Sequence, residues 1–228
     1  MKSFISASAA ALMLAYAAPA SASVTVGELP GNSGNCFPFS CTYNGTYQQI
    51  YGANAFSGVT LFDTLTFYVD PGFEGSVNTG TYDIKFYYSA ASVDGLSTNG
   101  SANLGSAIGN FGSFTLTGQF VDSTLVFSGV NLQYDPSLGN LLMNIAATTT
   151  VGGNTSFDSV FAIDETARQY SGLGLNGTDS LGLITTFSNE RTNAVPEPAT
   201  WAMMLLGFGV IGGAMRSRRR TQENFRIA

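Results

Sequence analysis

The chain has 228 residues, and its composition excludes several classes of function before any motif is considered. It contains no histidine, so catalytic triads, general bases and metal sites built on imidazole are excluded. Between Ser23 and Ala194, three basic residues face thirteen acidic ones, for a net charge of −10. A surface that binds phosphates needs the opposite sign, so we expect no nucleic-acid partner.

Residues 1–22 have the pattern of a secretory signal peptide, with Lys2 before an apolar run from Ile5 to Ala18. The small-x-small sites Ala18-Pro19-Ala20 and Ala20-Ser21-Ala22 follow. The apolar run is shorter than the ~20 residues of a membrane span, which favours cleavage over an uncleaved anchor. We therefore predict the secretion machinery and signal peptidase as partners, with cleavage after Ala22.

Cys36 and Cys41 are the only cysteines. Because export leads to an oxidising compartment, the pair predicts a local disulfide. A redox centre typically has two residues between its cysteines and lies at a helix N-terminus, so this spacing argues against one. Two thiolates without a nearby histidine argue against a metal site as well, and we expect no cofactor.

The segment 23–188 predicts an all-β fold, an antiparallel β-sandwich of Greek-key or jelly-roll type. In the expected strand over 59–69, Asp63 interrupts an apolar face formed by Leu61, Leu65, Phe67 and Val69. Residues 89–112 are rich in Gly, Ser and Asn and predict a connection. Further strands are expected at 81–88, 114–116, 141–151, 160–163 and, less regularly, 171–178. The short segments 120–121 and 125–127 are expected to pair with each other. The polar stretch from Phe187 to Ala194 indicates a linker, which we assign to 189–195.

Candidate site residues in this segment each have a structural interpretation that we favour. Asp164 and Glu165 are an adjacent carboxylate pair, but neighbours on a strand point to opposite faces, which favours a solvated strand end over a catalytic or Ca²⁺ site. Tyr43, Tyr47 and Tyr51 would suit a sugar-stacking platform, yet packing in the core fits them better. Glycosylation-type sequons are interpreted as turns; they begin at Asn44, Asn99, Asn154 and Asn176. We predict no catalytic residue and no metal ligand.

The C-terminal segment has three parts: Pro196-Glu197-Pro198, an apolar run over 201–215, and the arginines Arg216, Arg218, Arg219 and Arg220. As a helix, the apolar run would be about 22 Å long, a short transmembrane span. The arginines predict a cytoplasmic tail, residues 221–228, by the positive-inside rule. Gly207 to Gly212 matches GxGxxG, but a dinucleotide site needs a βαβ unit with an acidic residue ~20 positions on, and the sixteen residues that follow leave no room for it.

Residues 196–220 resemble the PEP-CTERM sorting domain of Gram-negative bacteria, in which the same three parts follow one another in the same order at the C-terminal end. The resemblance implies that exosortase, a membrane enzyme, recognises Pro196-Glu197-Pro198 and removes the helix. The membrane would then be a transient partner, and the protein would end at the cell surface or outside it.

The resemblance leads us to expect a non-enzymatic surface or matrix protein with a structural or adhesive role. The alternative is a carbohydrate-binding module for exopolysaccharide. An exposed row of aromatic rings would favour the alternative, and buried rings would favour the structural role.

Overall fold

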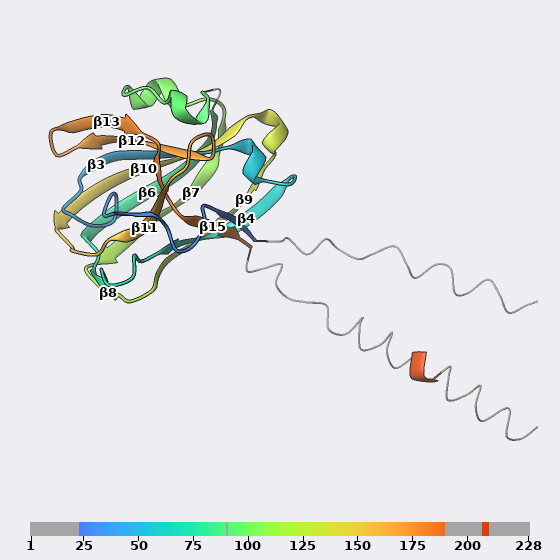
Figure 1. Ribbon diagram of the computed structural model, residues 1–228, viewed down its shortest axis with the longest axis horizontal. Coiled ribbons are helices and arrows are strands. Elements are labelled where there is room, and N and C mark those ends of the chain that lie inside the picture. The colour runs from blue at the N-terminus through green and yellow to red at the C-terminus, as the bar shows by residue number, and fades with distance from the viewer. Residues whose placement is uncertain (1–22, 90, 190–206, 210–228) are drawn as a thin grey trace, which may run out of the picture. The chain divides into compact units, whose positions relative to one another are not determined.

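The computed structural model describes residues 23–89, 91–189 and 207–209, and the domain it shows is built from antiparallel sheets (Figure 1). The prediction of an all-β antiparallel fold is confirmed. The larger sheet has six strands in the order β13 (Leu175–Asp179), β12 (Thr166–Gly172), β3 (Gly45–Tyr51), β10 (Asn140–Val151), β6 (Thr79–Ser89) and β7 (Ala107–Thr117). The second sheet has four strands in the order β1 (Val24–Val26), β15 (Thr185–Ser188), β4 (Thr60–Tyr68) and β9 (Thr124–Tyr134).

Short elements complete the domain around these two sheets. A three-stranded sheet joins β14 (Leu181–Leu183), β11 (Phe157–Phe161) and β2 (Ser33–Asn35), and β5 (Gly75–Ser76) pairs with β8 (Phe120–Val121). The 3-10 helices are η1 (Ala53–Ala55), η2 (Val93–Gly95), η3 (Gly100–Asn103) and η4 (Pro136–Leu138). The connection that carries η2 and η3 lies over the larger sheet, where it appears in green (Figure 1).

Aromatic rings fill the space between the two main sheets. The Phe62 ring of β4 lies 5.0 Å from that of Phe86 on β6 and 5.2 Å from that of Phe187 on β15. Phe39 is fully buried, and its ring lies within 6 Å of four others: Phe67, Tyr82, Phe127 and Phe157. The sheets therefore pack face to face, with edge-on and tilted ring contacts that add to simple burial.

The predicted face of β4 is wrong at Leu61. The register between β4 and β9 shifts between Phe62, which pairs with Leu132, and Thr64, which pairs with Ser128, so three residues of β9 lie opposite Asp63. Such an irregularity interrupts the regular alternation of side chains, so the set that faces inward changes across it. Phe62 is therefore buried and Leu61 is only half-buried, whereas Leu65 and Phe67 point inward as predicted.

Several predicted boundaries and pairings also change. The connection expected over 89–112 ends earlier, because β7 begins at Ala107 and pairs with β6. The segments 120–121 and 125–127 do not pair with each other: β8 pairs with β5, and β9 pairs with β4. Phe187, which the sequence placed in a polar stretch, is fully buried in β15. At the start of β7 and in β15, a partner strand orders residues that the sequence assigned to a connection or a linker, whereas for β8 and β9 only the choice of partner differs.

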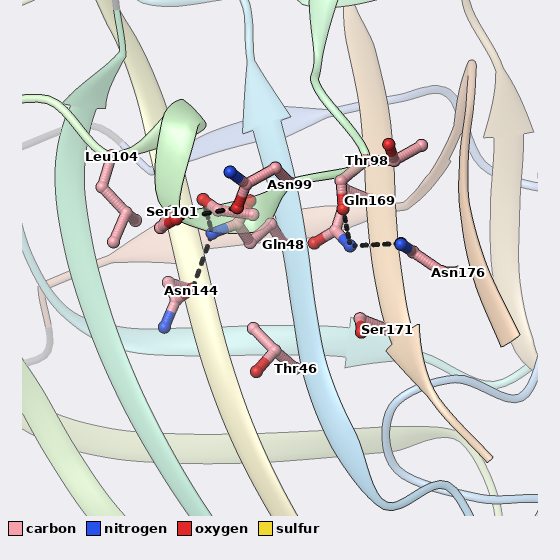
Figure 2. A pocket seen from close by; sticks show the side chains of 11 residues that line it. Thr46, Gln48, Thr98, Asn99, Ser101, Leu104, Asn144, Gln169, Ser171 and Asn176 are labelled. Carbon is pink, nitrogen blue, oxygen red and sulfur yellow. Dashed lines mark hydrogen bonds between the residues drawn. The ribbon is translucent and has the colours of Figure 1, made fainter. Parts of the chain in front are cut away.

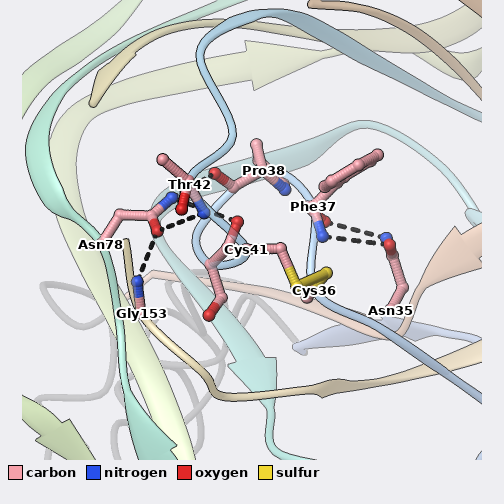
Figure 3. The surroundings of a disulfide bond; sticks show 9 residues. Asn35, Cys36, Phe37, Pro38, Cys41, Thr42, Asn78 and Gly153 are labelled. Atoms are coloured by element: carbon pink, nitrogen blue, oxygen red, sulfur yellow. Dashed lines mark hydrogen bonds between the residues drawn. A yellow bond between two sulfur atoms is a disulfide. The ribbon is translucent and has the colours of Figure 1, made fainter. Parts of the chain in front are cut away.

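The predicted disulfide between Cys36 and Cys41 is confirmed, with the two Cα atoms 5.7 Å apart. The side chain of Asn78 holds the end of this loop in place (Figure 3). Its Oδ1 accepts hydrogen bonds from the backbone N–H of Thr42 at 3.0 Å and of Gly153 at 2.8 Å. Its Nδ2 donates to the Ser40 carbonyl at 3.2 Å. The disulfide loop is thereby joined to the strands behind it.

The chain divides into two compact units, residues 1–191 and 192–228, and the β-domain belongs to the first. In the second unit, residues 207–209 are helical. No helix among the residues that the structure describes is both long and apolar enough to cross a membrane. The predicted signal peptide, Pro196-Glu197-Pro198, the arginines and all but three residues of the predicted span lie outside the described residues.

Candidate ligand-binding groove

The two faces of β3 differ because successive side chains of a strand point to opposite sides. Tyr47, Gln49 and Tyr51 point into the core and are fully buried. Gln48 points outward and lies opposite Asn144 of β10 on one side and Gln169 of β12 on the other. Three amide side chains thus form a row across three neighbouring strands, on the outer face of the six-stranded sheet.

The connection over residues 91–106 covers part of this outer face. At one end, Val93 and Leu96 pack against Ile50, Leu142 and Ala167 in a small second apolar core. This packing attaches the connection to the sheet. At the other end, η3 lies above the row of amides, so the contacts there are polar.

Gln48 joins η3 to the sheet, and each polar atom of its side chain has a partner. Its Nε2 donates to the Gly100 carbonyl at 2.9 Å and to Asn144 Oδ1 at 2.8 Å. Its Oε1 accepts a hydrogen bond from Asn103 Nδ2 at 2.8 Å. Asn103 is itself held by Ser97 and Ser89, so the polar end of the connection is well anchored.

Gln169 is fully buried but incompletely bonded. Its Nε2 makes two long hydrogen bonds, to the Thr98 carbonyl at 3.4 Å and to Asn176 Oδ1 at 3.3 Å. Its Oε1 has no hydrogen-bond partner. A Cβ added to Gly100 would lie 3.0 Å from this oxygen, so the glycine leaves it uncrowded. A buried acceptor without a partner is uncommon in folded proteins and carries a desolvation cost.

Between η3 and the strands lies a groove with a volume of about 650 Å³, within the usual range for small-molecule sites. Figure 2 shows its side chains, drawn from β3, β10, β12, β13 and the covering connection. Only Leu104 is apolar among the lining residues, and no lining residue is ionisable. The full lining is Thr46, Gln48, Thr98, Asn99, Gly100, Ser101, Leu104, Asn144, Gln169, Ser171 and Asn176.

The two charged residues next to the groove on β6 carry opposite charges. Lys85 of β6 follows Asn144 in the same row, and Asp83 lies two residues away on the same exposed face. The groove is therefore built for hydrogen bonding to neutral groups, with no general acid or base in its lining. Within the part of the chain that the structure describes, no three His, Cys, Asp or Glu side chains lie close enough together to hold a metal ion.

The three tyrosines singled out in the sequence lie in the core, as the favoured interpretation predicted. The hydroxyl of Tyr47 donates to Gln49 Oε1 at 2.9 Å, and that of Tyr51 shares a hydrogen bond of 2.9 Å with Thr185 Oγ1. Burial raises the pKa of Tyr43 to about 12 and also raises the pKa values of Tyr47 and Tyr51. None of the three rings is available to stack on a ligand.

The carboxylate pair lies in the turn between β11 and β12 rather than in a cleft. Glu165 Oε1 accepts a hydrogen bond from the Gly27 N–H at 3.0 Å, and Asp164 is exposed. Glu165 therefore supports a backbone segment.

Of the four sequon asparagines, Asn176 is in strand β13, so its interpretation as a turn is wrong. Asn99 precedes η3 and reaches the groove. The sequence analysis did not identify Gln48, Asn144 or Gln169, because only the strand register brings them together.

Residues 194–220 match the PEP-CTERM protein-sorting motif. The resemblance found in the sequence is thus confirmed, and the motif indicates exosortase-dependent export through a membrane-anchored intermediate to the cell surface. No curated protein and no solved structure matches the chain.

Proposed function

We propose that this protein is a non-enzymatic component of the cell surface or extracellular matrix, with a structural or adhesive β-domain. The observation that carries the proposal is the sorting motif at residues 194–220. In this scheme the signal peptide, residues 1–22, directs secretion, and Arg216, Arg218, Arg219 and Arg220 keep the tail cytoplasmic in the membrane intermediate. Exosortase then cuts at Pro196-Glu197-Pro198 and releases the domain from its helix.

The interior of the domain supports the structural role. Most of its aromatic rings pack in the core, although Phe73, Phe120 and Phe161 are exposed, and a disulfide closes the loop at its N-terminal end. Such a domain buries a large apolar area and suits an oxidising extracellular location.

The export step is tested by replacing Pro196, Glu197 and Pro198 together with alanine in the full-length chain. The variant is expected to stay at its unprocessed length in the membrane fraction, because exosortase no longer recognises it. Immunoblots of membrane, surface and medium fractions give the result.

A matched control carries three alanines at Arg191, Thr192 and Asn193, which precede the matched motif. This control should be processed and released as the parent chain is. Normal processing and release of the motif variant would contradict the proposal.

A carbohydrate-binding module for exopolysaccharide is the second candidate. The buried tyrosines give it no aromatic platform, but the amide-lined groove supports it independently. This candidate concerns what the adhesive domain holds once it has been exported.

A further inference from the structure

The groove offers hydrogen-bonding atoms that the protein itself leaves unused. Gln169 Oε1 is a buried acceptor without a partner, and Asn144 Nδ2 makes no hydrogen bond to any described residue. The hydroxyls of Thr46 and Ser171 also line the groove, on β3 and β12. A ligand that fits this set must both donate and accept hydrogen bonds.

The atoms in question are held by rigid elements. Gln169 and Asn144 lie on β12 and β10, on either side of β3 in the six-stranded sheet, and their register with Gln48 fixes their spacing. The covering connection is held to the sheet below it by Gln48 and by the apolar contacts of Val93 and Leu96. Binding to such a preformed site orders few side chains, which lowers the entropic cost.

The chemistry of the lining narrows the class of ligand. Phosphates and uronates are recognised through cations, and the lining has none. Nucleobases need aromatic rings on which to stack, and metal ions need carboxylates, and both are absent from the lining. A sugar hydroxyl donates and accepts at one atom, so a neutral polyol matches amides and hydroxyls well.

We infer that this groove binds a neutral saccharide segment through hydrogen bonds from Asn144, Gln169 and the flanking hydroxyls. The inference rests on the proposed adhesive role and names the class of ligand for it. Gly100 keeps the site open, because a glycine has no side chain to fill the space beside Gln169 Oε1. Since no charge takes part, the affinity should depend little on salt.

The test is calorimetric titration of the full-length chain, purified in an amine-oxide detergent that has no sugar headgroup. The probes are tetrasaccharides of glucose, mannose and galactose, and a uronic-acid tetrasaccharide for comparison. Binding of at least one neutral probe is expected, with an affinity that changes less than about 2-fold between low and high salt. The absence of binding by every neutral probe would overturn the inference, as would preferential, salt-sensitive binding of the uronate.

Two variants locate the site. Gly100→Ala places a methyl group beside Gln169 Oε1 without removing a polar atom, and it should weaken binding at least about 5-fold. Asn144→Ala removes the Nδ2 donor, together with the Oδ1 that accepts from Gln48, and should weaken binding about 3- to 10-fold. Gln133→Ala changes an exposed amide on β9 in the other sheet and should leave the affinity unchanged.

Thermal melting of each variant shows that the fold is kept. Unchanged affinity in both groove variants would place the saccharide elsewhere and overturn the inference. The export assay uses no saccharide, so failure of one experiment is distinguishable from failure of the other.

Discussion

The two faces of the six-stranded sheet use the same residue type in opposite ways. On the inner face, the Gln49 side chain makes three hydrogen bonds: it accepts from Tyr47 Oη and the Leu183 N–H and donates to the Leu183 carbonyl. On the outer face, Gln169 is equally buried but has two long hydrogen bonds and one unpartnered oxygen. A bonded amide stabilises the fold, whereas an unpartnered one costs stability and remains available to a ligand.

The covering segments explain this difference. On the inner face, the aromatic rings of β4 and β15 pack against the sheet, and the backbone of Leu183 in β14 hydrogen-bonds to Gln49. The outer face is covered only by the connection that carries η2 and η3, and an open groove remains beside η3. The inner face therefore supplies stability, and the outer face is where a binding function fits.

The largest expected effect is on the inner side, at Phe39. Phe39→Ala removes a fully buried ring that contacts four others, and it should lower the free energy of unfolding by about 3–5 kcal/mol. Urea unfolding followed by circular dichroism gives the value. A loss below about 1 kcal/mol would show that the interior is loosely packed. It would contradict the conclusion that the inner face supplies the stability of the fold.

A matched pair of substitutions compares the two glutamines directly. Gln49→Ala leaves the Tyr47 hydroxyl and the Leu183 N–H without partners and should cost about 2–4 kcal/mol. Gln169→Ala removes two long bonds together with the unpartnered oxygen and should cost less than about 1 kcal/mol. The urea midpoints of the two variants, measured under the same conditions, give the two losses of stability. Equal losses would mean that the outer amide is as structural as the inner one.

The inner tyrosines are expected to make the stability of the fold fall at alkaline pH. Burial raises the pKa of Tyr43 to about 12 and also raises those of Tyr47 and Tyr51, whereas the unfolded value is about 10. The folded state therefore favours the neutral phenols, so their contribution is complete below about pH 10 and is lost as the pH rises above it. Each of these phenols should lower the free energy of unfolding by about 1.4 kcal/mol per pH unit between about pH 10 and its own pKa in the folded state.

Urea midpoints across the alkaline range, together with tyrosinate absorbance, test the titration. Tyr51→Phe keeps the ring and removes one ionisable group, so its stability should fall less steeply with pH. A loss of stability that begins near neutral pH, or an identical slope in the variant, would point to another group.

The amino-acid sequence alone determined the export signal, the disulfide and the all-β class. These depend on local order or composition: Pro196-Glu197-Pro198 precedes an apolar run and arginines, Cys36 and Cys41 are the only cysteines, and strand periodicity is visible within single segments. The motif match and the structure confirm the sorting signal, the disulfide and the fold class.

Tertiary structure decided which residues meet. The register shift beside Asp63 changed which side chains of β4 face inward, and pairing with β6 ordered the start of β7, which the sequence assigned to a connection. The row of Asn144, Gln48 and Gln169 depends on the register of three strands that are far apart along the chain. No local pattern encodes that register, because it follows from burying one face of each strand in a shared core.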